Sequence, residues 1–412
     1  MNTPICYVTR DIERALGLPL DTPGYFIIAN SSPFANHIAK GHDNVLLIDA
    51  GRQLDTWELL GHAQVKQFIK PLRGKEGSRR HVGGVVDVVV FKPTKQIEEI
   101  CTTHGWRLLN PAAELSANIE EKITQLTFLS ALRRLFPPYE VTTAEKVVWS
   151  GNPLVVQFNH SHTGSGTVLI SSALDLEKLQ EQFPKRDVRT TDYIDGPLFT
   201  NNNVVTKDHI LVGNISYQIT GLAPFTDRPF ATIGNDWALP TKLLTPKQIE
   251  EYTSIAETVG DELRSKGWKG LFGIDVVLEQ KTGKLFLLEI NARQPASTAF
   301  EAQLQSMKTL KHENMKTIFE THLAALLDTD LVGQELISID DGAQIIFRNQ
   351  DGQNKNILHS AFNILPSHGF TVIPYPNTKP GSDLLRIQSP HGIMADHNKF
   401  NSIGEKILKA IV

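Results

Sequence analysis

Residues 271–294 read LFGIDVVLEQKTGKLFLLEINARQ. This stretch predicts a β-hairpin, because two short apolar runs rich in β-branched and aromatic residues flank a polar segment that contains glycine. Side chains alternate between the two faces of a strand, so one face of the hairpin is expected to be wholly apolar. We expect that face to contain Phe272, Ile274, Val276, Leu278, Phe286, Leu288 and Ile290.

The opposite face carries Asp275 on the first strand and Glu289, Asn291 and Arg293 on the second. A three-residue turn at 281–283 that ends in a left-handed glycine would place Asp275 directly across from Glu289. Mg²⁺ prefers carboxylate and amide oxygens together with substrate phosphates, so we predict Asp275, Glu289 and Asn291 as metal ligands. The planar guanidinium of Arg293 can donate two parallel hydrogen bonds to a nearby phosphate or carboxylate. The alternative, a solvent-facing hairpin edge with Arg293 as counter-ion, explains four such side chains on one face less well.

A second informative stretch, residues 153–170, reads PLVVQFNHSHTGSGTVLI. It predicts a strand, a polar glycine loop and another strand, and the backbone N–H groups of such a loop can bind phosphates. Gly164, Ser165 and Gly166 are the candidates for a lid over the phosphates. Any β-hairpin with a flexible tip has the same pattern, so this loop alone is not specific.

The remaining pattern indicates several parts. Apolar runs alternate with amphipathic segments up to about residue 113, which is typical of a parallel sheet in an α/β domain. The strands expected there are 25–29, 45–48, 85–91 and 106–109, with a helix at 96–104. A helix capped by Asn118 and a β-rich lobe follow, and then a long helix from Thr245 and a helical stretch at about 299–327. The last residues hold short strands rich in glycine and proline and end in a short helix, which predicts a small mixed α+β domain.

The amino-acid composition restricts the structural class and the location of the protein, but it does not indicate a particular function. The 412 residues are 41% hydrophobic and 21% charged, as in folded globular chains of several domains. A net charge of −4 disfavours nucleic acid and anionic membranes as partners. Cys6 and Cys101 are the only cysteines, which fits a reducing compartment. Because the N-terminus lacks a signal-peptide pattern and no apolar run is long enough for a bilayer, we expect a cytoplasmic protein without a membrane partner.

A glycine loop in a small β lobe, followed by the Asp…Glu-x-Asn strand pair, resembles the ATP-grasp superfamily over roughly residues 20–330. The resemblance implies α/β and α+β domains in the order of a Rossmann-like domain, a two-lobed ATP-grasp domain and the small C-terminal domain. The corresponding ranges are 1–113, 114–330 and 331–412, with a lid lobe at about 140–195 and a metal-binding lobe at about 196–330. The resemblance also implies two Mg²⁺ ions, with Mn²⁺ as a substitute, on Asp275, Glu289 and Asn291. It makes Arg293 the catalytic residue, which steadies the transferred phosphoryl group or acyl phosphate.

The resemblance also implies a set of ATP contacts, in which the backbone of 192–194 holds the adenine and Asn201 faces the ribose. The full set is Lys122, Gln157, His162, Gly164, Ser165, Gly166, Asp192, Tyr193, Ile194 and Asn201. Lys122 has a structural alternative as a solvent-facing helix lysine, and Tyr193 and Ile194 have one as core residues of a strand. Relatives carry a lysine where this chain has Gln157. Either Lys122 or a loop histidine, His160 or His162, supplies the missing charge, or nucleotide affinity is modest.

Among members of the superfamily, the architecture is most similar to amino-acid and peptide ligases. The implied function is an ATP-dependent carboxylate–amine ligase that forms an amide through an acyl phosphate and releases ADP and phosphate. The implied partners are a small carboxylate and an amine, either amino acid or peptide, and a homodimer is expected because symmetric dimers are common. Three alternatives remain: a carboxylase or carboxylate kinase, a catalytically silent ATP sensor, and a dinucleotide-binding enzyme. The last has little support, because no G-x-G-x-x-G follows YFIIANSSPFANH.

Overall fold

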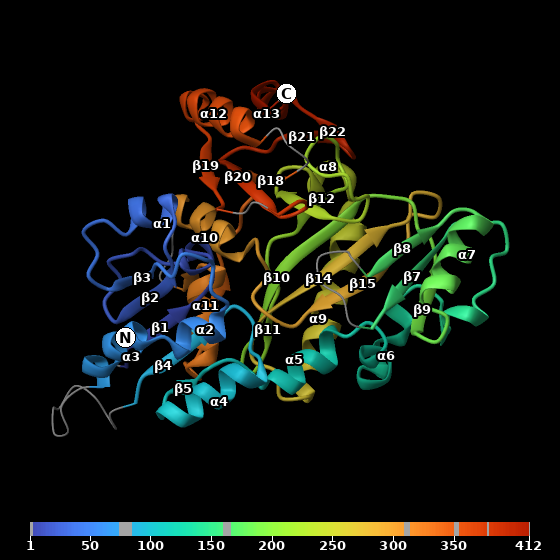
Figure 1. Ribbon diagram of the computed structural model, residues 1–412. Helices are drawn as coiled ribbons and strands as arrows, with labels where there is room; N and C mark the ends of the chain where they lie inside the picture. The colour runs from blue at the N-terminus through green and yellow to red at the C-terminus, as the bar shows by residue number, and fades with distance from the viewer. Residues whose placement is uncertain are drawn as a thin grey trace.

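The N-terminal segment forms a five-stranded parallel sheet (Figure 1). In the computed structural model, which describes residues 3–73, 85–159, 166–308, 314–349, 354–376 and 379–411, the strand order is β3-β2-β1-β4-β5. The strands are β1 (Ile5–Val8), β2 (Tyr25–Asn30), β3 (Val45–Ile48), β4 (Asp87–Val90) and β5 (Arg107–Leu108). Alternate residues of β1 belong to apolar clusters on the two sides of the sheet. The predicted parallel α/β sheet is therefore confirmed, although its central strand β1 was missed.

Helices cover both faces of this sheet. The helices of the segment are α1 (Pro33–Ile38), α2 (Thr56–Gly61), α3 (Ala63–Ile69) and α4 (Lys95–His104), with 3-10 turns at Ile12–Ala15 and Lys70–Arg73. Helices α2, α3 and α4 pack on one face, and α1 packs on the other face together with α11 (Ile318–Leu326) from much later in the chain.

A four-stranded antiparallel sheet follows, in the order β6-β9-β7-β8. It contains β6 (Tyr139–Thr143), β7 (Leu154–Phe158), β8 (Thr167–Ile170) and β9 (Asp187–Asp192), with α7 (Ala173–Gln182) on its apolar face. The chain enters through α5 (Ala113–Glu120), α6 (Thr124–Phe128) and a 3-10 turn at Ser130–Leu135, and a second 3-10 turn, Ala144–Lys146, follows β6. The helix expected from Asn118 is thus wrong: α5 begins five residues earlier and ends at Glu120, before Lys122.

A nine-stranded sheet forms the largest layer of the molecule, in the order β15-β14-β10-β12-β13-β18-β20-β19, with β11 beside β10. Its strands up to the hairpin are β10 (Leu198–Val205), β11 (Ile210–Leu211), β12 (Ser216–Thr220), β13 (Thr232–Asp236), β14 (Gly270–Leu278) and β15 (Leu285–Asn291). The short α8 (Pro240–Leu243) precedes the long α9 (Pro246–Ser265). A capping box between Thr245 and Gln248 and proline in the first turn start α9 where the sequence predicted.

The C-terminal segment extends this large sheet. Its strands β18 (Ala343–Arg348), β19 (Thr371–Pro374) and β20 (Asp383–Ser389) continue from β13, and their apolar residues share one core with α9 and the hairpin. The other elements are α10 (Thr298–Met307), β16 (Met315–Lys316), β17 (Glu335–Leu336), α12 (Asn354–Ile364), a 3-10 turn at Pro366–His368, β21 (Met394–Asp396), β22 (Lys399–Phe400) and α13 (Ser402–Ile411). The helical stretch expected at 299–327 is two helices, α10 and α11. No helix within the described ranges is long and apolar enough to cross a membrane.

Candidate functional site

The polar end of the hairpin β14–β15 has the predicted strand register, but the turn that produces this register differs from the predicted one. Asp275 lies directly across from Glu289, and Gly273 from Asn291. The turn, however, is a four-residue loop at 280–283, in which the Glu279 N–H donates to the Lys284 carbonyl and the Gly283 N–H donates to the Glu279 carbonyl. A β-bulge beyond Asp275 then shifts the pairing by one residue. The predicted three-residue turn is therefore wrong, whereas the left-handed Gly283, with φ of 72°, is as predicted.

The bulge also changes which side chains face the core. Leu285, Leu287 and Ile290 join Phe272, Ile274, Val276 and Leu278 in the apolar cluster. The prediction that Phe286 and Leu288 share that face is wrong, because the extra residue at the bulge reverses the alternation on its far side. At the polar end of β15, the bulge keeps Glu289 directly across from Asp275.

Asp275, Glu289, Asn291 and Lys122 come together on the polar face of this hairpin. The Lys122 Nζ lies 2.5 Å from Oε1 of Glu289, and Nδ2 of Asn291 donates to Oδ2 of Asp275 at 3.4 Å. Burial and the adjacent Glu289 charge raise the pKa of Asp275, although Thr200, Lys122 and Asn291 oppose the increase. Lys122 is buried between α5 and α6, so it is not the solvent-facing helix lysine of the alternative interpretation.

This donor set suits a hard divalent cation. Two carboxylates and an amide oxygen are the ligands through which Mg²⁺ binds together with substrate phosphates. A cation between Asp275 and Glu289 would relieve the repulsion that raises the pKa of Asp275. Within the described ranges, no three His, Cys, Asp or Glu side chains gather at one point, so the cluster is no all-protein cage. The residues present therefore fit a metal that arrives with a ligand.

Arg293 lies two residues beyond β15 and forms an ion pair with Glu120, at the end of α5. Glu120 also pairs with Lys92, which follows β4 of the N-terminal sheet. Burial alone would raise the pKa of Glu120, but Arg293 and Lys92 lower it, so this carboxylate stays charged. Arg293 is consequently held at the junction of the hairpin, α5 and the N-terminal sheet. Sequence reasoning missed Glu120 and Lys92, because they come from separate parts of the chain.

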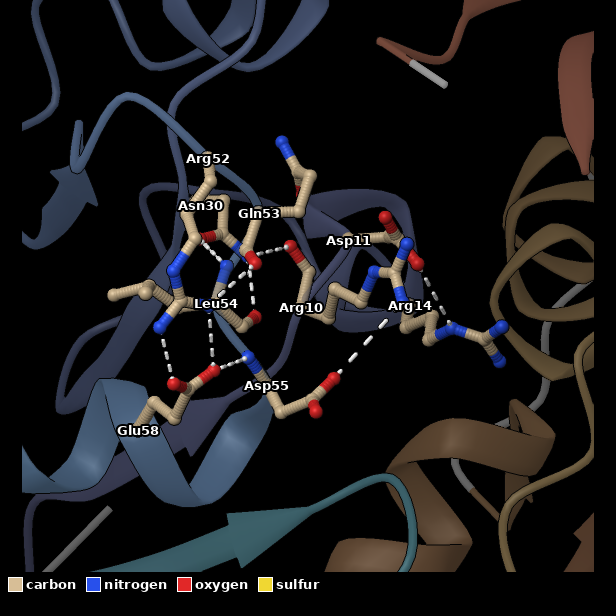
Figure 2. A network of polar contacts seen from close by, with 9 residues as sticks. All are labelled: Arg10, Asp11, Arg14, Asn30, Arg52, Gln53, Leu54, Asp55 and Glu58. Carbon is tan, nitrogen blue, oxygen red and sulfur yellow. Dashed lines mark hydrogen bonds and ion pairs between the residues drawn. The ribbon is translucent and has the colours of Figure 1, made fainter. Parts of the chain in front are cut away.

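The next residue ties the hairpin to the N-terminal domain. Gln294 accepts a hydrogen bond from the Tyr7 hydroxyl at 2.6 Å and donates to the Arg14 carbonyl at 2.8 Å. Figure 2 shows how the loop after β1 is fixed: Asn30 donates to the carbonyls of Arg10 and Leu54, both at 2.9 Å. The loop that borders the site is therefore held by side chains of the N-terminal sheet.

Gln157 lies on β7 of the lid lobe, and its Nε2 donates to the Thr167 hydroxyl at 3.4 Å. Gly166 is buried, and its carbonyl accepts from the Phe158 N–H at 2.9 Å. His160, His162, Gly164 and Ser165 lie outside the described residues. The lid strands thus position Gln157 and the base of the glycine loop.

The segment predicted to hold adenine connects the two lobes. Asp192 ends β9, and the chain then passes through Tyr193 and Ile194 to β10. Tyr193 is 39% exposed, and its backbone N–H bonds to the Pro153 carbonyl at 3.1 Å. This is a connecting segment with an exposed aromatic ring, so the alternative of a core strand is wrong for Tyr193.

Asn201 does not join the other predicted residues. It pairs with Ile274 in the ladder, so its side chain lies on the core face of the sheet. There it exchanges hydrogen bonds with Asn203 at 2.7 and 2.8 Å and accepts from the Tyr252 hydroxyl at 3.3 Å. The predicted ribose contact is contradicted, because this buried side chain faces away from Asp275. The adjacent Thr200 pairs directly with Asp275, so the side chain of Thr200, not that of Asn201, lies on the polar face of the sheet.

A buried polar row that the sequence did not reveal crosses the large sheet from Thr200. Ser216 donates to the Thr200 carbonyl, Asn235 to Ser216 and Gln344 to Asn235, each at 3.2 Å, and Arg386 donates to Gln344 at 2.9 Å. The polar face that carries Asp275 therefore continues from β14 to β20. Period-two alternation within each strand could have signalled it, but the strand order could not be predicted.

The row ends at the N-terminal domain. Arg386 donates to the Tyr375 hydroxyl at 3.0 Å, and Tyr375 donates to the Glu13 carboxylate at 2.6 Å. A line of buried hydrogen bonds thus joins the C-terminal strands to the loop after β1. The acidic cluster lies on the large sheet, next to the contacts of Arg293 and Glu120 that lead to the N-terminal sheet, and such boundaries between packed units are common positions for binding sites.

Comparison with known proteins gives structural matches only, since no protein-family model and no curated protein sequence matches the chain. The ADP complex of PurK, an N5-carboxyaminoimidazole ribonucleotide synthetase, is 10% identical, with a TM-score of 0.67 and coverage of 99% of this chain and 96% of that one. The N5-carboxyaminoimidazole synthase from Aspergillus clavatus, with ADP and 5-aminoimidazole ribonucleotide, is 16% identical, with a TM-score of 0.65 and coverage of 100% and 98%. An L-amino acid ligase from Bacillus licheniformis is 14% identical, with a TM-score of 0.58 and coverage of 95% and 93%.

Proposed function

We propose that this chain, which has the ATP-grasp fold, is an ATP-dependent carboxylate–amine ligase that forms an amide or peptide bond through an acyl phosphate. The observation that carries the proposal is the convergence of Asp275, Glu289, Asn291 and Lys122 beneath a glycine-loop lobe. Two acids and an amide on one sheet face, with a buried lysine in contact with one of the acids, are an arrangement suited to metal-bound phosphates.

In this proposal Asp275, Glu289 and Asn291 hold Mg²⁺, in two ions, with Mn²⁺ as a substitute. The metal, when bound, neutralises charge on the β- and γ-phosphates of ATP. Lys122 contacts the phosphates, and the backbone of 192–194 receives the adenine. Gly164, Ser165 and Gly166 stay the predicted lid over the phosphates, whose task is to exclude the water that would hydrolyse the acyl phosphate.

The proposed reaction has two steps. A carboxylate oxygen of the substrate attacks the γ-phosphorus, the bond to the β-phosphate oxygen breaks, and ADP leaves. The amine nitrogen then attacks the acyl carbon, the bond to the phosphate oxygen breaks, and the amine loses a proton as the amide forms. Arg293, held beside the hairpin by Glu120, stabilises the charge on the transferred phosphoryl group.

The partners in this proposal are a small carboxylate and an amine, of the amino-acid or peptide class. Similarity to an L-amino acid ligase over 95% of this chain supports that class. Buried free thiols at Cys6 and Cys101 support the proposal of a cytoplasmic enzyme. A homodimer stays a prediction.

A second candidate is a carboxylase that phosphorylates bicarbonate. It is favoured by the similarity to an N5-carboxyaminoimidazole ribonucleotide synthetase and an N5-carboxyaminoimidazole synthase, for which the coverage is 96% or more of both chains. Product analysis separates the two candidates: the ligase yields an amide between two organic substrates, whereas the carboxylase yields a carbamate only when bicarbonate is present.

The test is ADP release from the purified protein with Mg-ATP, screened against pooled amino acids, small peptides and bicarbonate. We expect release that requires a carboxylate and an amine together and that a D275N/E289Q variant abolishes. Tight ATP binding without stimulated release would contradict the ligase and favour an ATP sensor. Release that bicarbonate alone supports would favour the carboxylase.

A further inference from the structure

Arg189 lies at the centre of the lid sheet, beside Gln157, where relatives carry a lysine. In the β-ladder it pairs directly with Gln157 on β7 and with Val141 on β6. Residues directly opposite each other in antiparallel strands share a face, so Arg189 and Gln157 lie on the same side of the lid. The neighbours of Arg189 in sequence and ladder, Val188 and Val156, belong to the apolar cluster under α7. Arg189 therefore faces away from α7.

The guanidinium of Arg189 is buried and incompletely bonded. The residue is 1% exposed, and among the described residues neither Nε nor Nη1 has a hydrogen-bond partner. Its Cζ lies 5.1 Å from the centroid of the Phe136 ring and 5.7 Å from that of Tyr139. Two aromatic rings can hold a guanidinium in place without using its N–H donors.

The electrostatics connect this guanidinium to the acidic cluster. Burial lowers the pKa of Arg189 to about 10, and the charges of Tyr139 and Glu289 oppose that decrease. Glu289 belongs to β15 of the large lobe, so a cation on the lid acts on a carboxylate of the proposed metal site. A buried cation with unused donors is costly unless a ligand completes its hydrogen bonds. An anion bound between the two lobes would do so.

We propose that Arg189 binds the phosphate groups of the nucleotide and supplies, from the strand beside Gln157, the positive charge that Gln157 lacks. The inference rests on the proposed function, because it assumes a nucleotide between the lobes. The sequence also offers Lys122, His160 and His162 as sources of this charge, and the two histidines lie outside the described residues. Lys122 pairs with Glu289 and so approaches the phosphates from the side of the large lobe, which leaves the lid side to Arg189.

The test compares ATP and adenosine affinities of the full-length protein by competition titration. Arg189→Met keeps a long apolar stem against the two rings but removes the charge and the N–H donors. We expect ATP affinity to fall by about 10- to 100-fold, as for loss of a charge-assisted contact, and adenosine affinity to stay unchanged. Arg186→Met is the matched control. Arg186 also lies over aromatic rings, Phe158 and Phe183, but it is exposed, so ATP affinity should not change.

A double variant tests the charge directly. Gln157→Lys in the R189M background restores a cation on the adjacent strand, and we expect it to recover most of the lost ATP affinity. If R189M does not fold, Arg189→Lys replaces it. Lysine keeps the positive charge but lacks the paired N–H donors of the guanidinium, so ATP affinity should fall by roughly three- to tenfold while adenosine affinity is unchanged.

The outcomes separate the inference from the proposed function. Wild-type protein that binds no ATP overturns both. Wild-type protein that binds ATP, with the folded Arg189 variant binding it equally well, overturns the role of Arg189 and leaves the ligase standing. An equal loss of ATP and adenosine affinity also overturns the inference, because it marks Arg189 as a support of the lid rather than a phosphate contact.

Discussion

Asp275 and Glu289 are two acids opposite each other on one sheet face, with Lys122 in contact with Glu289. In the absence of a cation, burial and mutual repulsion destabilise this pair. Residues that are unfavourable for folding but suited to a ligand are typical of functional sites. We therefore expect the two acids to lower the stability of the ligand-free protein and to contribute to ligand binding.

Asp275→Asn should raise the free energy of unfolding measured in EDTA by about 1 kcal/mol, because it removes one charge of the repelling pair. The same variant should lose substrate-stimulated ADP release. Denaturant titration and an ADP assay measure the two effects. Asp261→Asn is the control, since Asp261 is 59% exposed and pairs with Arg264 on the surface of α9. A D275N variant that is strongly destabilised would contradict this account.

Glu301 on α10 gives a pH-dependent prediction. Burial raises its pKa to about 7 from a usual 4.5, although Asn214 and Asn202 donate to it. Its folded-state pKa is raised, so its stabilising contribution is present below pH 4.5 and is lost as the pH rises through about 7. The loss amounts to at most about 3 kcal/mol. Glu301→Gln should remove it, so the variant gains stability relative to wild type between pH 5 and 8. Parallel thermal midpoints for the two proteins across that range would refute the assignment.

At the scale of elements, the bulge in β15 and the loop at 280–283 together determine which side chains face which way. Had the hairpin formed a three-residue turn without a bulge, the far half of β15 would present Phe286 and Leu288 to the core. The observed hairpin presents Leu285 and Leu287 instead. Periodicity alone cannot reveal a bulge, because both alternatives place apolar residues on the core face.

Gly283→Ala should lower the free energy of unfolding by about 1 kcal/mol, because φ is 72° at this position. A Cβ there would lie 3.5 Å from Nε2 of Gln248, an ordinary contact, so strain in the backbone is the only cost. ATP affinity should be unchanged, since the bulge lies between the loop and Glu289. Urea titration and an ATP-binding assay test both statements, and a loss of ATP affinity would show that the loop determines the register.

Elements with strong local signals were predicted well, whereas those determined by tertiary packing were not. Helix α9 has a capping box, a first-turn proline and a long amphipathic pattern, and it begins where expected. Strand β1 has four residues, too few for periodicity, yet it is the centre of its sheet. Asn159 accepts from the N–H groups of residues 123 and 124 and thereby fixes the break between α5 and α6. No local pattern predicts that contact.

At the scale of the whole molecule, the C-terminal segment shares its core with the large lobe. Strand β18 pairs with β13, and Phe347 and Leu385 lie in the same apolar cluster as Tyr252. Strand order across a sheet depends on long-range pairing, which the sequence pattern does not encode. The prediction of a small mixed segment was therefore possible, but its fusion to the large sheet was not.

A protein that ends at residue 330 should be poorly soluble or lack cooperative unfolding, because truncation exposes the edge of β13 and opens the shared core. Expression of residues 1–330 beside the full chain, followed by thermal unfolding, is the measurement. A truncated protein that unfolds cooperatively at the wild-type temperature would show that the C-terminal strands are dispensable for the fold.

Alternation predicted that Glu289 and Asn291 share one face of the second strand, but the position of Asp275 across from Glu289 depends on a four-residue loop and a bulge that the sequence did not reveal. Asn201 was misplaced, because a run of three asparagines in β10 gave no indication of which one faces the core. Arg189 was missed for a related reason: its importance depends on its cross-strand partner. Contacts between strands distant in sequence require the register, and only the folded structure provides it.

The most direct test of the proposed chemistry follows oxygen atoms. The carboxylate substrate found in the ADP-release screen is labelled with ¹⁸O in its carboxyl group and turned over with Mg-ATP and the amine. Attack by the carboxylate on the γ-phosphorus, and later loss of phosphate, predicts one ¹⁸O atom in each phosphate released and the other in the amide. Unlabelled phosphate accompanying amide formation would contradict an acyl-phosphate intermediate and, with it, the proposed function.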